Sequence, residues 1–218
     1  MKNTQILEML NAGQIEELTV KIKEEIYQDS LKKDTGAKQR YAAMKRFFKY
    51  GISNKNTPAL TMPYNIDTEY TSFCDGHGAA LTKESIGELE MYDEGKHGKY
   101  VDVLKLFPTS DNGYSVFKNV SFAEIFAKAK ADGYKLKKAT AEFKEPYVVK
   151  MNNHYFNLAV IDKVISILDD GNGFEVWVNT KNSYSTIFVF SSIGKGIICP
   201  VNPNAIKDSM KIYELYLN

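Results

Sequence analysis

The sequence predicts an α+β fold with a helical appendage at its amino terminus, and three observations lead to that prediction. Residues 14–28 carry apolar side chains at helical spacing. Two later segments, 37–82 and 158–201, each run from a helical pattern into strand-like stretches. Of the 218 residues, 44% are hydrophobic and 25% are charged, which is the composition of a globular domain that buries its own core.

The appendage, residues 1–36, is expected to contain two helices that are separated at Gly13. In the second helix, apolar side chains recur at spacings of three and four at Ile15, Leu18, Ile22 and Ile26. Turn-forming residues at 30–36 predict a linker to the following helix. The amphipathic helix either covers the sheet or serves as a dimerisation element, and the sequence leaves both readings open.

Residues 37–50 predict a helix that ends at Gly51 and has a basic and an apolar side. At about 100° per residue, four basic side chains share one side and are the candidate DNA-contact residues: Lys38, Lys45, Arg46 and Lys49. Such a stripe would meet phosphates without reading bases. The alternative is an ordinary solvated face, because lysine is common at exposed helical positions.

The middle of the chain predicts short strands, a long loop and one helix. Strands are expected around 64–74 and at 78–82, a loop with one embedded strand at 84–113, and a helix at 121–132. Ser121 and Glu124 have capping-box spacing at the start of that helix. The lysine-rich stretch 128–144 reads as a solvated helix end and loop.

The last third predicts a strand, a helix and three further strands, at 146–151, 158–170, 173–179, 184–191 and 195–201. The polar side of the helix at 158–170 carries Asp162, Lys163, Ser166 and Asp169, so it lacks a second basic stripe. The tail at 205–218 contains Tyr213 and Tyr216 and reads either as an interaction tail or as a last element packed on the domain.

Two segments in the same order resemble the bacterial DNA sliding clamp, the processivity ring of DNA polymerase. FCDGHGAALTK at 73–83 is similar to a strand–turn–strand of that family, with matching positions at Asp75, Gly76, His77, Ala80 and Leu81. NLAVIDKVISILDDGNGFEVWVNTKNSYSTIFVF at 157–190 resembles the second helix of a clamp domain and the strands after it. The segments 57–66 and 194–203 are compatible with neighbouring parts of the same domain.

The resemblance covers about residues 37–204 and implies one clamp-like domain of two helix-plus-sheet halves, with an insertion at about 84–145. It implies a non-enzymatic protein of phage or mobile-element origin that holds duplex DNA electrostatically in replication or repair. In that family, helices bearing basic residues face the DNA. Gly78 stands where the family usually has arginine. The family carries three domains per chain and closes two chains into a ring, so a single domain implies self-assembly or partners.

The alternative function is a protein-interaction module or inhibitor on a clamp-like fold. It would act on a host replication or defence protein without binding DNA, because a fold alone does not determine function. A third reading, a Cys/His enzyme, requires Cys74, His77 and another polar side chain around one cleft.

Composition and motifs argue against several other classes of function. The 28 basic and 27 acidic residues leave a net charge of +1, so only a local patch could attract nucleic acid. The chain lacks a long apolar run and a secretory signal, which favours a cytoplasmic protein without a membrane span. Cys74 and His77 have ligand-like spacing but no second tight pair, so we expect neither metal nor cofactor. Nucleotide-binding and zinc-protease motifs are missing, which favours a non-enzymatic protein.

Overall fold

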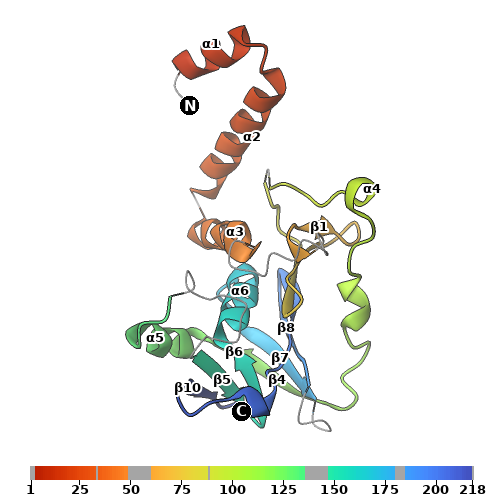
Figure 1. Ribbon diagram of the computed structural model, residues 1–218, viewed down its shortest axis with the longest axis vertical. Helices are drawn as coiled ribbons and strands as arrows, with labels where there is room; N and C mark the ends of the chain where they lie inside the picture. The colour runs from red at the N-terminus through yellow and green to blue at the C-terminus, as the bar shows by residue number, and fades with distance from the viewer. Residues whose placement is uncertain are drawn as a thin grey trace.

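A computed structural model describes residues 3–32, 34–48, 60–87, 89–135, 147–179 and 185–217 (Figure 1). These residues form a mixed α+β architecture with a seven-stranded antiparallel sheet, a three-stranded sheet and six α-helices. The α+β prediction is therefore confirmed. Gly51 and Lys49 lie outside the described residues.

The helices are α1 (Asn3–Asn11), α2 (Ile15–Leu31), α3 (Thr35–Phe47), α4 (Glu94–His97), α5 (Ala123–Ala131) and α6 (Leu158–Leu168). The large sheet has the strand order β1-β2-β3-β9-β8-β7-β4. Its strands are β1 (Tyr64–Asn65), β2 (Thr71–Cys74), β3 (Gly78–Thr82), β4 (Tyr114–Val120), β7 (Phe174–Asn179), β8 (Ile187–Ser191) and β9 (Gly194–Ile198). The small sheet has the order β10-β5-β6, with β5 (Tyr147–Met151), β6 (His154–Asn157) and β10 (Lys211–Leu215).

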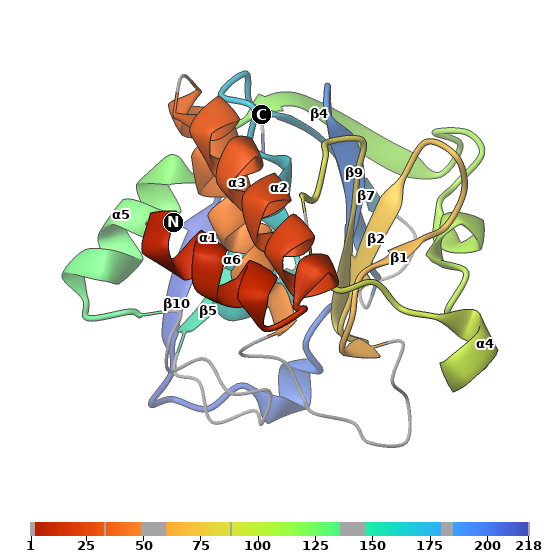
Figure 2. The ribbon, with the colours of Figure 1, turned by 90° about the horizontal axis from the view of Figure 1, so that it is seen from above.

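The order of one helix followed by three strands occurs twice in the large sheet. Helix α3 precedes the meander β1-β2-β3, and α6 precedes the meander β7-β8-β9. The two meanders meet where β3 pairs antiparallel with β9, from Gly78 opposite Ile198 to Thr82 opposite Gly194. Helix α6 packs against β3 and β9, and α3 packs against α6 (Figure 2). Both helices therefore lie on the same side of the sheet.

Helix α6 is the centre of the core. Nine of its eleven residues are buried, so it is enclosed by the large sheet, α3 and the small sheet rather than lying on the surface. Two strand glycines allow this close approach. A Cβ atom at Gly196 would lie 2.5 Å from Val164 Cγ1, and one at Gly78 would lie 2.7 Å from Val160 Cγ1. Side chains at these two positions would force the helix away from the sheet.

A buried ion pair ties α6 to the turn between β2 and β3. Lys163 Nζ lies 2.9 Å from Asp75 Oδ2, and the two side chains are 7% and 3% exposed. The other carboxylate oxygen accepts hydrogen bonds from the backbone N–H groups of His77 and Gly78, at 3.0 and 3.1 Å. The prediction that Lys163 lies on a polar helix face is wrong, because the helix has no solvated face at this position.

Helices α1 and α2 form a hairpin that projects from the rest of the molecule (Figure 1). The predicted break at Gly13 is confirmed, with a φ of +71°. The linker is shorter than the predicted 30–36, because α2 continues to Leu31 and α3 begins at Thr35. Asp34 caps α3, and its Oδ1 accepts a hydrogen bond from the Ala37 N–H at 2.9 Å.

The region expected as an insertion differs from its prediction in three elements. The embedded strand predicted at 100–106 is wrong: Val103–Leu106 form a 3-10 helix, followed by Phe107, whose ring packs against Phe188 at 5.6 Å. Strand β4 was not predicted, and it forms an edge of the large sheet beside β7. The capping box predicted for Ser121 and Glu124 is also wrong. The residue at the cap position of α5 is Phe122, and the Glu124 carboxylate pairs with Lys128 at 2.7 Å.

The tail packs on the domain as a strand. β10 pairs in parallel with β5, from Lys211 opposite Tyr147 to Leu215 opposite Met151. Tyr213 is buried and donates a hydrogen bond to Asp132 Oδ2 at 2.8 Å, whereas Tyr216 is 75% exposed. Strand β6 was not predicted as a separate element.

Candidate nucleic-acid interface

Helix α3 carries the predicted basic face, and Arg40 fixes its position. The Arg40 side chain is 10% exposed and donates from Nε and Nη2 to the two carboxylate oxygens of Glu84, at 2.7 and 2.6 Å. Its Nη1 donates to the backbone oxygen of Asp169 at the end of α6, at 3.1 Å. A bidentate pair of this kind has strong geometric preferences, so Arg40 orients α3 and has its charge neutralised.

The structure describes three of the four predicted DNA-contact residues, all but Lys49, and these three differ in their surroundings. Lys38 is exposed and forms no ion pair with a described residue. Lys45 instead turns toward the hairpin, with Nζ 3.0 Å from Glu24 Oε1 and 4.9 Å from the ring centre of Tyr41. Arg46 is exposed, and its Nε donates to the Ala42 backbone oxygen at 3.1 Å.

Glu24 is the residue of α2 that neutralises Lys45. Its carboxylate also accepts hydrogen bonds from the Tyr41 hydroxyl at 2.9 and 3.0 Å and from Gln28 at 2.8 Å. Burial acts to raise the pKa of Glu24, but the hydrogen bonds from Gln28, Lys45 and Tyr41 outweigh it, so the pKa lies below its usual value. Lys45 is therefore a contact between the appendage and α3 and is not free for an external phosphate.

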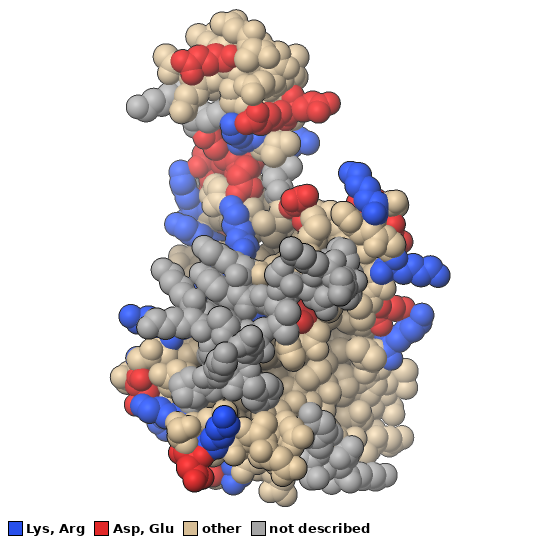
Figure 3. Space-filling model, viewed as in Figure 1, with Lys and Arg blue, Asp and Glu red and all other residues tan. Residues whose placement is uncertain are grey.

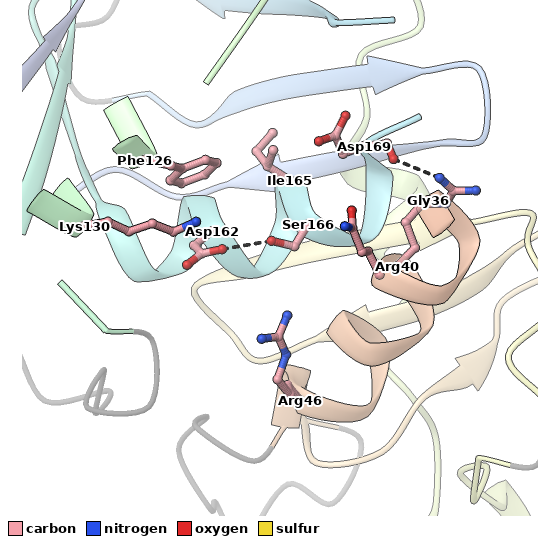
Figure 4. Close-up of a pocket in the computed structure, with 10 residues that line it drawn as sticks. Gly36, Arg40, Arg46, Phe126, Lys130, Asp162, Ile165, Ser166 and Asp169 are labelled. Carbon is pink, nitrogen blue, oxygen red and sulfur yellow. Dashed lines mark hydrogen bonds between the residues drawn. The ribbon is translucent and has the colours of Figure 1, made fainter. Parts of the chain in front are cut away.

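A groove of about 330 Å³ lies between α3, α5 and α6 (Figure 4). Figure 4 shows Arg46 extending from α3 and Lys130 from α5, with Asp162 and Ser166 on α6 between them. A second cavity of about 650 Å³ adjoins it and shares four lining residues, Phe126, Lys130, Ile165 and Asp169. Lys130 was not among the predicted contact residues. The sequence places Lys130 on the predicted helix at 121–132. It does not show that this helix packs beside α6, which is what brings Lys130 to the groove.

Charged residues of both signs line this groove, Asp162 and Asp169 as acids and Arg40, Arg46 and Lys130 as bases. Asp162 accepts hydrogen bonds from Ser166 Oγ at 2.8 Å and from the Tyr134 hydroxyl at 3.0 Å. Neither Arg46 nor Lys130 forms an ion pair within the described part of the chain. An anion in the groove would therefore be attracted by Arg46 and Lys130 and repelled by Asp162, which argues against a small anion bound inside it.

The face of the molecule seen in Figure 3 carries side chains of both signs. In the view of Figure 3, acidic side chains gather along the projecting hairpin, and basic side chains are dispersed over the body. This pattern agrees with the net charge of +1. Attraction of a polyanion would depend on a few local cations and would be weak for a single chain.

The surroundings of Cys74 do not activate its thiol. Cys74 is buried, and burial is the main cause that raises the pKa of its thiol to about 11, so the thiol is protonated at neutral pH. Burial also lowers the pKa of His154. Among the described residues, no group of three His, Cys, Asp or Glu side chains is placed to hold a metal ion. No helix in the described ranges is long and apolar enough to cross a membrane.

No protein-family model, curated protein or solved structure matches the chain. The clamp-like assignment stays a prediction from the sequence segments at 73–83 and 157–190.

Proposed function

We propose that the protein is a non-enzymatic, DNA-associated protein with one clamp-like domain that holds duplex DNA through sequence-independent contacts in replication or repair. The observation that carries the proposal is a set of three exposed cations on helices α3 and α5, Lys38, Arg46 and Lys130. None of them has an ionic partner among the residues that the structure describes, so each is available to a phosphate oxygen. The proposal includes a cytoplasmic location and self-association.

The repeated helix-plus-three-strand order supports the clamp-like part of the proposal. Two such units meet at β3 and β9, with α3 and α6 beside each other on one side of the sheet. Gly78, which replaces the arginine of the resembled family, has no room for a side chain because Val160 and Val164 of α6 approach it closely. The DNA contacts must therefore come from other residues, and α3 and α5 offer them.

The expected affinity for DNA follows from the number of free cations. Three phosphate contacts give a slope of roughly −2.7 in a plot of log K against log salt. A rise from 50 to 200 mM salt should then weaken binding about 40-fold. This is a modest effect for a protein that makes only three contacts, and it can be measured with a fluorescently labelled duplex.

The test compares the parent with two variants, each of which replaces three cations by glutamate. The two variants therefore have the same net charge. One carries Glu in place of Lys38, Arg46 and Lys130, and the control carries Glu in place of three exposed lysines elsewhere in the chain, Lys99, Lys118 and Lys207. Binding to duplex DNA is measured by fluorescence anisotropy at both salt concentrations, and circular dichroism verifies folding. We expect the first variant to lose binding and the control to keep most of it. A folded parent that does not bind at 50 mM salt, or equal losses in both variants, would refute the proposal.

A second candidate function is the protein-interaction module or inhibitor that acts on a host replication or defence protein. The observation that favours it is the projecting hairpin, which exposes several large apolar side chains. This candidate requires no DNA binding, so the same experiment separates the two. A parent that is folded, monomeric and indifferent to DNA would favour this second candidate.

A further inference from the structure

The hairpin α1–α2 carries most of the exposed apolar surface in the described part of the chain. Ten large hydrophobic side chains are strongly exposed in that part, and six of them belong to the hairpin: Leu7, Leu10, Ile15, Val20, Ile22 and Ile26. Ile15 and Ile26 are 63% and 65% exposed. Scattered apolar residues on a surface need no explanation, but a concentration on one projecting element indicates a surface that is covered in solution.

Three of these residues share one face of α2, which we call the isoleucine stripe: Ile15, Ile22 and Ile26. At about 100° per residue they fall within roughly 40° of one another around the helix. The residues that attach α2 to the body lie about 120–180° away around the helix. Tyr27 stacks edge-on against Tyr41 at 4.9 Å, and Glu24 binds Lys45. The stripe therefore points away from the domain, and α2 does not use it to cover the sheet.

We propose that the isoleucine stripe is covered by α2 of a second copy of this chain, packed antiparallel about a two-fold axis. In the register that centres the stripe, Ile15 lies level with Ile26 of the second copy. Glu16 and Lys23 share one flank of the stripe, and a two-fold axis brings the same flank of both helices together. Each Glu16 then lies within about 3 Å, along the helix axis, of Lys23 of the second copy.

The charges on this flank favour an antiparallel pair over a parallel one. Glu16 and Lys23 are both exposed, and neither has an ion pair to another described residue. The neighbouring Lys21 is already paired with Glu17 at 2.7 Å. In a parallel pair the two-fold axis runs along the helices and turns the Glu16 and Lys23 flanks of the two copies to opposite sides, so Glu16 and Lys23 do not meet. The antiparallel pair gains two complementary contacts instead.

The area of the stripe sets the expected strength of the dimer. A helix of 17 residues is about 25 Å long and about 10 Å wide, so the α2 pair covers roughly 500 Å² in total. That is below the standard size of a stable interface, so we expect a reversible dimer that forms at tens to hundreds of micromolar protein. The inference does not depend on DNA binding and would survive the failure of that proposal.

The first experiment is sedimentation velocity of the full chain from about 5 to 500 μM. The parent should shift from monomer to dimer across this range. A variant with Ser at Ile15, Ile22 and Ile26 should dimerise at least roughly 100-fold more weakly. The control carries Ser at three exposed apolar residues elsewhere, Val101, Leu106 and Ile212, and should behave as the parent. A parent that stays monomeric at 500 μM, or a stripe variant that dimerises like the parent, would overturn the proposal.

A charge exchange then tests the antiparallel arrangement. Glu16→Lys alone and Lys23→Glu alone should each weaken the dimer about tenfold, because each replaces two attractions by two repulsions. The double variant Glu16→Lys/Lys23→Glu should restore the parent affinity, since the exchange again places a cation opposite an anion at both contacts. Failure of the double variant to recover would refute the antiparallel register. Circular dichroism of every variant verifies that the total helix content is unchanged.

Discussion

The buried pair between Lys163 and Asp75 leads to the sharpest prediction about stability. Replacing Lys163 by Met keeps much of the apolar stem and removes the ammonium group that lies 2.9 Å from Asp75 Oδ2. Asp75 would keep its two backbone hydrogen bonds on Oδ1 but would leave a charged oxygen buried without a cation. Breaking one partner of a buried pair costs about 3–5 kcal/mol. We therefore expect Lys163→Met to lower the free energy of unfolding by about 3–5 kcal/mol.

The assay is urea unfolding followed by fluorescence of Trp177, the only tryptophan in the chain. The matched control is Lys128→Met, which breaks an exposed pair with Glu124 whose side chains are 63% and 80% exposed. The control should change stability by less than about 1 kcal/mol. Adding Asp75→Asn to Lys163→Met should recover part of the loss, because the buried charge disappears. A loss below about 1 kcal/mol for Lys163→Met would refute the claim that this pair anchors α6.

Two further predictions concern the strand glycines and the hairpin. Gly196→Ala should destabilise the protein by about 1–3 kcal/mol in urea unfolding, because its Cβ would lie 2.5 Å from Val164, and an additional Val164→Ala exchange should relieve part of that loss. Glu24→Gln should weaken attachment of the hairpin by about 0.5–1 kcal/mol at pH 7, measured as hydrogen exchange of α2 amides. Because the pKa of Glu24 is lowered in the folded protein, its contribution is present above the unfolded pKa and lost as the pH falls through the folded one, so parent and variant should converge in acid.

The sequence predicted the elements whose pattern is local. Helix α6 has apolar residues at helical spacing, and β7, β8 and β9 are rich in β-branched and aromatic residues, so these elements were found within a few residues of their ends. Strand β4 was missed because its residues are only half-buried at the edge of the sheet, and their pairing with β7 is a long-range contact. The 3-10 helix at Val103–Leu106 was mistaken for a strand because a short apolar run does not distinguish the two.

The candidate interface was only partly predictable from the sequence. Whether a cation is free or paired depends on residues that are far away along the chain. Arg40 is neutralised by Glu84 and Lys45 by Glu24, which are 44 and 21 residues away in the chain. Lys130 reaches the groove only because α5 packs near α6. A helical projection can place cations on one face, but it cannot say which of them the folded chain has already paired.

The number of free cations on each chain links the DNA-binding proposal to the proposed dimer, because it sets the salt dependence of DNA binding. Lys45 is paired with the hairpin, so under the DNA-binding proposal one chain offers Lys38, Arg46 and Lys130. If two chains pair through the isoleucine stripe and both contact one duplex, the number of phosphate contacts doubles to six. Counterion release then predicts a slope of roughly −5.4 instead of −2.7, and a fourfold rise in salt would weaken binding about 2,000-fold instead of about 40-fold. The salt dependence of DNA binding therefore reports whether one or two chains hold the duplex, and the stripe variant should return the slope to the single-chain value.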